Sequence, residues 1–547
     1  MPVVDLSYKR LQKLIGKATK KQISDSLPFL GLDIESEDGD SVRIEYSPNR
    51  PDYSTDYGIA IGMQGLLGIK TGSIKLRIKQ SSKQSISVKP QVSKVRPFVT
   101  GIIAKNGNLD DTAIKQFMAM QEDLHFGIGR KRRKSSIGIH DLDKICFPLV
   151  YTTITKNHKF VPLHSEKEMS VSDILKETDV GKEYGHLLEN HSEVPIILDS
   201  NEQTVSLPPI INAAKTTLTN KTKNLFVEVT GINKQDAEDM LAVVATILQS
   251  AGFTLESINI SGNKNSTPKF QLRKMKINDS LVNQILGLKL STSKIVSSLK
   301  RSRLDATING KSILCTIPPY RFDIFGPMDL VEEVSLGYGT PNITPILSPS
   351  QTIGQTNPVS IHLRSLDQTM VGLGYHEALN SSLTSKRVLY DMVNRESKNI
   401  ISVLDSKSQE HTILRDAVFP GLLENISRNI HEPYPQKLFE SGTVFSLNDP
   451  VSEKINFAGI SAHKDVTFTE IKSVLFSAMK MGFAIEIQTK SFDHPSFEKG
   501  HCAEVLVNGR SIGVIGMINS KVVEKYKIRV SVAAFEISLS DSVFKSF

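Results

Sequence analysis

Three short polar segments divide the chain and limit the size of any single hydrophobic core. They cover residues 80–85, 261–268 and 345–358, and consist mostly of small polar residues with Gly and Pro. Such stretches are typical of linkers at domain boundaries. A chain of 547 residues is long enough for several domains, each with its own core. We therefore predict four domains, at residues 1–80, 92–262, 269–344 and 358–547.

Each block combines helix and strand signals, which predicts a multidomain α/β (α+β) fold. Runs of β-branched and aromatic residues indicate strands, and apolar residues at helical spacing indicate helices. In the first block, Ser54 is the expected helix N-cap and Gly68 the expected helix end. The expected strands are 42–46, 98–104, 225–230, 437–440 and 533–537, and the expected helices are 54–67, 112–125, 235–251, 363–373 and a segment beginning at Pro420.

The composition and charge exclude several classes of protein. No run approaches the ~18 apolar residues of a membrane span, and the first residues lack a signal core, so we expect a cytoplasmic protein without a membrane partner. The formal charge of +8 favours a polyanionic partner without identifying one. Cys146, Cys315 and Cys502 match no zinc or thioredoxin spacing, and we expect three buried structural thiols.

No GxGxxG, P-loop, nucleophile-elbow or HExxH motif occurs in the sequence. Dehydrogenase, P-loop NTPase, α/β-hydrolase and zincin functions therefore have no motif support.

An acidic group surrounds the expected start of a helix at Pro327. Asp329, Glu332 and Glu333 lie at i, i+3 and i+4 and share one helix face, and Asp323 lies in the preceding loop. Four carboxylates form an all-oxygen set of the kind that Mg²⁺ prefers. The alternative is that acids in a first helical turn only complement the helix dipole.

A basic run and a His–Asp pair follow the helix expected at 112–125. The run could bind phosphate groups of a nucleic acid or form a solvated loop; it consists of Arg130, Lys131, Arg132, Arg133 and Lys134. His140 and Asp141 are adjacent on an expected strand and point to opposite faces, which argues against a catalytic dyad.

The strand expected at 225–230 has one apolar and one partly polar face. Leu225, Val227 and Val229 form a core face. Glu228 and Thr230 lie on the opposite face, which is either a polar pocket floor or an exposed sheet face. A rigid, polar-tipped loop covers residues 206–212.

A series of stretches, in order from the first block to the last, forms one further pattern. They are Tyr46–Asp52, Gly129–Asp143, Ser206–Asn212, Phe226–Thr230, Pro319–Gly339, Leu414–Leu423 and Leu438–Phe445. Over most of the chain, this series resembles the β subunit of phenylalanyl-tRNA synthetase in its archaeal and eukaryotic form. On this resemblance, we expect neither the inserted oligonucleotide-binding barrel nor the anticodon-binding module of the bacterial form.

The resemblance implies an α2β2 heterotetramer that attaches phenylalanine to tRNA(Phe), in which the α subunit binds ATP and phenylalanine. It implies a mixed-sheet tRNA-binding and editing domain at 92–262, a winged-helix-like domain at 269–344, and a catalytically silent class II synthetase-like domain at 358–547. Editing would hydrolyse Tyr-tRNA(Phe). The competing hypothesis is a tRNA-binding scaffold subunit without editing activity; a free-standing winged-helix protein would leave the last block unexplained.

The resemblance also assigns site residues. The implied Mg²⁺ ligands are Asp323, Asp329, Glu332 and Glu333, at or near the contact with α. The implied editing pocket contains Glu228, Thr230, Ser206, Pro208 and Asn212, and the basic run is a candidate tRNA contact. No aminoacylation residue is expected in this chain, because residues 535–541 offer no cation for ATP phosphates.

Overall fold

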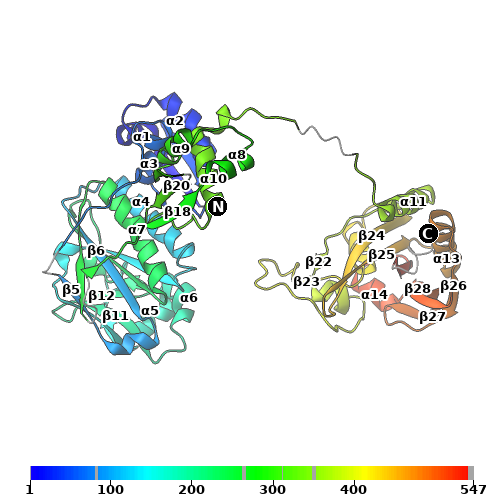
Figure 1. The fold of residues 1–547 in the computed structure, drawn as a ribbon. Helices are drawn as coiled ribbons and strands as arrows, with labels where there is room; N and C mark the ends of the chain where they lie inside the picture. The colour runs from blue at the N-terminus through cyan, green and yellow to red at the C-terminus, as the bar shows by residue number, and fades with distance from the viewer. Residues whose placement is uncertain (1, 81–83, 262–265, 311, 348–352, 540–547) are drawn as a thin grey trace. The chain divides into compact units, whose positions relative to one another are not determined.

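The computed structural model describes residues 2–80, 84–261, 266–310, 312–347 and 353–539. The chain forms two compact units, Met1–Leu347 and Ser348–Phe547, each with mixed α/β structure (Figure 1). Among the described residues, no helix is both long and apolar enough to cross a membrane.

The first domain is a three-stranded antiparallel sheet packed against helices. The sheet order is β1 (Val3–Ser7), β3 (Ser41–Tyr46), β2 (Leu32–Asp38), and the helices are α1 (Tyr8–Ile15), α2 (Lys20–Ser26) and α3 (Asp56–Leu66). The predicted strand 42–46 is confirmed. The predicted N-cap Ser54 is wrong, because its hydroxyl donates to the Pro51 carbonyl oxygen at 2.7 Å. Thr55 caps α3 instead, accepting from the Gly58 N–H at 3.2 Å.

The middle region contains two sheets. The five-stranded sheet has the order β4 (Ile78–Lys79), β15 (Thr254–Glu256), β6 (Phe98–Lys105), β14 (Leu225–Gly231), β7 (Ser135–Asp141). The apolar side chains of this sheet bury against α4 (Asp111–Phe126) and α7 (Lys234–Ser250). Both predicted strands and both predicted helices of this region are confirmed, with small shifts at their ends.

The second sheet has seven strands and covers the other face of β14. Its order is β13 (Ile211–Asn212), β12 (Thr204–Leu207), β11 (Glu193–Leu198), β8 (Leu149–Thr155), β5 (Ser85–Val88), β16 (Ile258–Ser261), β17 (Ser266–Thr267). Phe226 packs with Tyr151 and Ile197 between the two sheets. Every residue of β14 is therefore buried, and the polar face of this strand is not an exposed sheet face.

Two expected linkers contain strand residues. β4 and β5 precede the predicted domain start at 92, yet they pair within the two sheets of the middle region. The stretch 261–268 contains β17, which pairs with β16 through Asn259 and Ser266; residues 262–265 lie outside the described part.

A small helical region with a three-stranded sheet follows. The sheet order is β18 (Arg273–Ile277), β20 (Ser312–Ile317), β19 (Asp305–Asn309), and the helices are α8 (Asp279–Leu286), α9 (Thr292–Arg301) and α10 (Pro327–Tyr338). Pro327 begins α10 as predicted. Ile295, Leu299, Leu330 and Val334 form the centre of its core.

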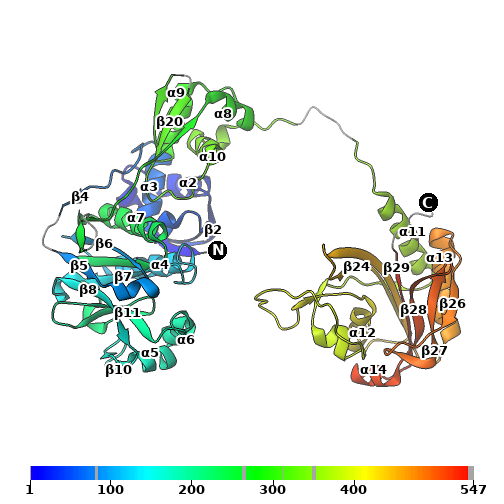
Figure 2. The same ribbon diagram turned by 60° about the horizontal axis from the view of Figure 1, so that its bottom comes forward.

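The second unit is a seven-stranded sheet with helices on both faces (Figure 2). Its order is β21 (His376–Glu377), β24 (Gln436–Ser446), β25 (Ser452–Ala462), β29 (Val532–Ser538), β28 (Arg510–Ile518), β27 (Phe497–Val507), β26 (Gln488–Ser491). One apolar cluster joins the sheet to α11 (Pro358–Gly372) and α13 (Phe468–Phe483). The other joins it to α12 (Phe419–Arg428) and α14 (Ser520–Lys525). The predicted strands and helices of this block are confirmed; residues 348–352 of the expected linker lie outside the described part.

The cysteine prediction is wrong at one position. Cys315 and Cys502 are buried, but Cys146 is exposed. Cys146 lies in the connection between β7 and β8, and connecting segments run over the surface.

Candidate active site

A cavity of about 760 Å³ lies in the middle region, between α4, β7, β14 and the β12–β13 hairpin. Four of the five predicted pocket residues line it: Glu228, Ser206, Pro208 and Asn212. The segment 206–212 forms a wall because Ser206 pairs with Asn212 and Leu207 with Ile211 across the hairpin. The structure thus brings together residues that are distant in the sequence.

Glu228 is a buried carboxylate with one free oxygen. The residue is 2% exposed. Its Oε1 atom accepts a hydrogen bond from the Ser206 hydroxyl at 2.9 Å, whereas Oε2 has no hydrogen-bond partner among the residues that the structure describes. A buried acceptor without a partner is costly, so this oxygen is suited to receive a donor from a ligand.

His140 does not line the cavity, but it lies beside it on β7 and holds a second buried polar atom. Its Nδ1 atom is 2.8 Å from the Thr216 hydroxyl. Its Nε2 atom lies 4.0 Å from Glu228 Oε1 and has no hydrogen-bond partner within the described part of the chain. Between them lies Gly138. A Cβ atom at Gly138 would lie 2.4 Å from His140 Nε2, 2.6 Å from Glu228 Oε1 and 3.1 Å from Asn212 Oδ1. Three polar atoms from three strands therefore converge on the space above this glycine.

The interpretation of His140 from the sequence was incomplete. Asp141 points to the other face of β7, where it accepts from the Thr222 hydroxyl at 2.8 Å, so the two side chains point to opposite faces as predicted. The same alternation places Ser136, Gly138 and His140 on one face, and the pairing of β7 with β14 sets Gly138 opposite Glu228. Strand alternation at 136, 138 and 140 was the signal that could have identified His140.

Thr230 lies beside the cavity and does not line it. Its hydroxyl accepts from Arg96 Nε at 2.9 Å and lies 3.2 Å from the Ser136 hydroxyl, which is part of the wall. Arg96 is 3% exposed, and burial lowers its pKa to about 10. Thr230 is thus separated from the cavity by Ser136.

The opposite wall of the cavity combines apolar side chains with one ion pair. The apolar members include Ile114, Met118, Ile137 and Ile210. Arg132 donates to both carboxylate oxygens of Glu122, at 2.8 and 2.9 Å, and to the Ile210 carbonyl oxygen at 2.7 Å. Burial opposes ionisation of Glu122, but the hydrogen bond from His125 and the charge of Arg132 lower its pKa to about 2.

The five cations of the basic run have three different environments. Arg130, Lys131 and Arg133 are exposed, and Lys134 lies 3.4 Å from Asp236. Arg132 is buried in the cavity wall and also lies over the ring of Tyr184. Arg132 is therefore a structural cation, because it lacks the exposure of a surface phosphate contact and both of its Nη atoms already donate within the fold.

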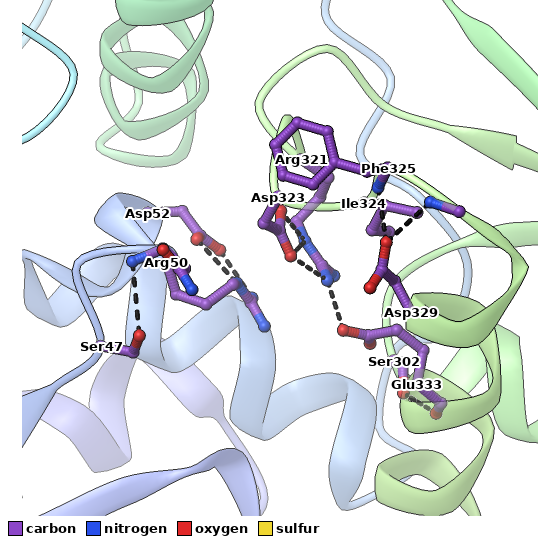
Figure 3. A network of polar contacts seen from close by, with 12 residues as sticks. Ser47, Arg50, Asp52, Ser302, Arg321, Asp323, Ile324, Phe325, Asp329 and Glu333 are labelled. Atoms are coloured by element: carbon purple, nitrogen blue, oxygen red, sulfur yellow. Dashed lines mark hydrogen bonds and ion pairs between the residues drawn. The ribbon is translucent and has the colours of Figure 1, made fainter. Parts of the chain in front are cut away.

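The four predicted metal ligands do not converge (Figure 3). Arg321 Nε lies 2.9 Å from one oxygen of Asp323, its Nη2 lies 2.8 Å from the other, and Nη2 also contacts Glu333. Asp329 accepts the backbone N–H groups of Phe325 and Gly326 at 2.6 and 2.8 Å. Glu332 is exposed on α10.

These residues do not fit a four-carboxylate magnesium site. Two of the carboxylates already share a cation of this chain, and a third satisfies the helix N-terminus. Within the described ranges, no three His, Cys, Asp or Glu side chains are placed to share a metal ion. The alternative of a helix-terminal role holds for Asp329; the magnesium assignment itself stays a prediction.

Comparison with protein families gives three matches in chain order. The models are the B3/4 domain over residues 121–241, the tRNA synthetase B5 domain over 275–340, and the phenylalanyl tRNA synthetase beta chain CLM domain over 343–539. The first match contains most of the cavity wall, and the second contains α10. This combination is that of an aminoacyl-tRNA synthetase.

Full-length relatives specify the family. The chain is 38% identical over 546 residues to the phenylalanine–tRNA ligase beta subunit of Archaeoglobus fulgidus, covering 99% of this chain and 98% of the relative. It is 34% identical to that of Methanosarcina acetivorans, covering 100% of both. The N-terminal fragment of the phenylalanyl-tRNA synthetase beta subunit from Pyrococcus horikoshii superposes with a TM-score of 0.59 at 29% identity, over 62% of this chain and all of the fragment. The chain belongs to the family of phenylalanine–tRNA ligase β subunits.

Proposed function

We propose that this chain acts with an α subunit, as α2β2, in attaching phenylalanine to tRNA(Phe) with ATP, and that its own cavity hydrolyses Tyr-tRNA(Phe). The observation that carries the editing proposal is the buried Glu228 carboxylate with its free Oε2 atom in the cavity. The α subunit binds ATP and phenylalanine in this proposal.

Proofreading is required because a hydrophobic slot built for phenylalanine rejects an added hydroxyl only weakly, by roughly 100-fold. The editing cavity must make the opposite choice and require the phenol hydroxyl. Glu228 Oε2 is an acceptor for that hydroxyl, and His140 Nε2 lies across the same space. Phenylalanine would leave these polar atoms unpaired, whereas the apolar wall accepts either aromatic ring.

The hydrolysis needs only a positioned water, because the ester bond between amino acid and tRNA is activated. The polar edge of the β12–β13 hairpin can hold such a water near the ester. Ser206 is held by its hydrogen bond to Glu228, and we assign no nucleophilic residue. The exposed Arg130, Lys131 and Arg133 are proposed phosphate contacts for the tRNA.

We assign the remaining domains by the same reasoning. Residues 1–80 form an opening domain, 269–344 a winged-helix-like domain, and 358–547 a class II synthetase-like domain without synthetic activity. In the last of these, Glu536 occupies the strand where a phosphate-binding arginine is needed. Its carboxylate accepts the N–H groups of Val418 and Phe419, at 3.0 and 2.9 Å, and is buried. A buried carboxylate there supports a structural rather than a nucleotide-binding role.

The test compares Glu228→Ala with Glu193→Ala, an exposed carboxylate on β11 of the same region. In the complex with α, Glu228→Ala should leave phenylalanine charging intact and allow Tyr-tRNA(Phe) to accumulate. Glu193→Ala should behave as the unchanged protein. If the unchanged complex fails to deacylate Tyr-tRNA(Phe), the scaffold function without editing is correct instead. If Glu228→Ala deacylates normally, the pocket assignment is wrong.

A further inference from the structure

The acidic residues around the start of α10 surround an arginine that is almost completely buried. Arg321 is 1% exposed. It contacts Asp323 through Nε and Nη2, and the same Nη2 contacts Glu333, so one guanidinium joins two carboxylates (Figure 3). Burial opposes ionisation of Asp323, but the charge of Arg321 holds the pKa of this carboxyl below its usual range.

The other two carboxylates are not directed at this arginine. Asp329 accepts two backbone N–H groups at the N-terminus of α10, and Glu332 is exposed. The four acids therefore have three different environments: two pair with Arg321, one accepts helix N–H groups, and one is exposed. Their spacing in the sequence suggests a single shared site. A divalent cation bound between Asp323 and Glu333 would have to displace Arg321 into water or leave two cations side by side, and both are unfavourable.

A second arginine approaches this cluster from the first domain. Arg50 pairs with both oxygens of Asp52, at 2.9 and 2.8 Å, and its guanidinium lies 3.9 Å from the centre of the Tyr53 ring. Burial would lower the pKa of Arg50, but the charges of Asp52 and Asp323 raise it well above its usual value. Figure 3 shows the Arg50–Asp52 pair facing Asp323 and Arg321.

Further polar contacts join the same two regions. Arg301 donates to the carbonyl oxygen of Leu66 at the end of α3, and Arg303 Nη1 donates to that of Lys70 at 2.6 Å. The Ser73 hydroxyl donates to Asp305 at 2.6 Å. The Arg321 cluster thus lies in a contact region shared by the opening domain and the region that matches the B5 domain.

We propose that Arg321, rather than Mg²⁺, is the resident cation of these carboxylates, and that the Arg321–Asp323–Glu333 cluster fixes the opening domain to the B5-like region. Arg321 neutralises Asp323 and Glu333 from within the fold. Its guanidinium serves two carboxylates at once through Nε and Nη2, which a lysine ammonium does not reproduce. The contact needs no dissolved metal, so it holds equally in the presence of a chelator.

The first test needs no substitution. The full chain, and its complex with α in the absence of ATP, are treated with EDTA, dialysed against millimolar Mg²⁺ and analysed for bound metal by mass spectrometry. We expect no stoichiometric magnesium and the same midpoint of thermal unfolding with EDTA as with Mg²⁺. One equivalent of Mg²⁺ per chain that is lost in Asp323→Asn or Asp329→Asn would overturn the proposal.

The second test compares Arg321→Met and Arg321→Lys with Glu332→Gln, a neutral control at the exposed acid of the same helix. Both Arg321 variants should unfold several degrees lower and become more sensitive to proteolysis between the opening domain and α10. Glu332→Gln should match the unchanged chain. If the Arg321 variants unfold and digest like the unchanged chain, the cluster does not join these regions; if Glu332→Gln is as damaging as Arg321→Met, the acids act as one metal-binding set and the proposal is wrong.

Discussion

Gly138→Ala adds one methyl group at the point where three polar atoms converge beside the cavity. The new Cβ atom would lie 2.4 Å from His140 Nε2 and 2.6 Å from Glu228 Oε1, whereas ordinary contacts begin at 3.4 Å. Both side chains must therefore move by close to an ångström, or the phenol hydroxyl must leave this space. The crowded atoms are side-chain ends rather than backbone, so β7 can keep its pairing with β14.

A displacement of about 1 Å at a reacting group can cost on the order of 100-fold in rate. We therefore expect Gly138→Ala to slow deacylation of Tyr-tRNA(Phe) by about that factor while phenylalanine charging is unchanged. Single-turnover deacylation by the complex with α is the assay, with circular dichroism and thermal unfolding to show that the variant is folded. Gly372→Ala is the matched control, because a Cβ atom there meets nothing within 4 Å. Normal deacylation by a folded Gly138→Ala protein would refute the convergence of His140, Glu228 and Asn212 on the substrate hydroxyl.

Three further predictions concern synthesis, stability and pH. The isolated chain should show no phenylalanine-dependent ATP–pyrophosphate exchange, since residues 535–539 offer no cation; exchange at the rate of the complex would contradict this. Arg415→Met should lower the free energy of unfolding, measured by urea titration, by roughly 3–5 kcal/mol. The reason is that Glu440, which is 1% exposed, would stay buried without its ion pair. The control Arg428→Met removes an exposed ion pair and should lower the free energy of unfolding by less than about 1 kcal/mol. The pKa of Asp323 in the folded chain lies below its ordinary value of 3.8. The ionised carboxylate therefore stabilises the fold fully above pH 3.8, and this stabilisation is lost as the pH falls through the lower pKa of the folded state. Asp323→Asn should therefore lower the free energy of unfolding at neutral pH and make it depend less on pH below about pH 4. If the free energy of unfolding falls below about pH 4 as steeply as in the unchanged chain, Asp323 does not make this contribution.

Strand alternation along β14 predicted that Glu228 and Thr230 share one face. The pairing of β14 with its neighbouring strand determines which other side chains lie beside them. The sequence places Glu228 and Thr230 on one face of β14, but only the register with β7 sets Gly138 opposite Glu228 and Ser136 opposite Thr230, with His140 next along the same face of β7. Thr230 belongs to the same face and still misses the cavity, since Arg96 and Ser136 lie around it. Periodicity specifies the face of a strand and not which neighbour covers that face.

The acidic group shows a similar limit. Helical spacing correctly places Asp329 and Glu333 in α10 after Pro327. It says nothing of Arg321, twelve residues before Glu333, because that contact depends on the path of the loop between β20 and α10. The buried Arg132 within the basic run has the same cause, since the loop there runs through left-handed conformations at Arg130, Lys131 and Arg132. Charge patterns identify ionic groups; loop geometry selects the partners.

The strand β5 restricts how this chain can be divided for expression. It lies between β8 and β16 in the interior of the seven-stranded sheet, pairing in parallel with both. A recombinant fragment that begins at residue 92 would remove this strand and expose the hydrogen-bonding edges of its two neighbours, which promotes aggregation. Fragments of the middle region should therefore begin before Ile78, so that β4 and β5 are both retained.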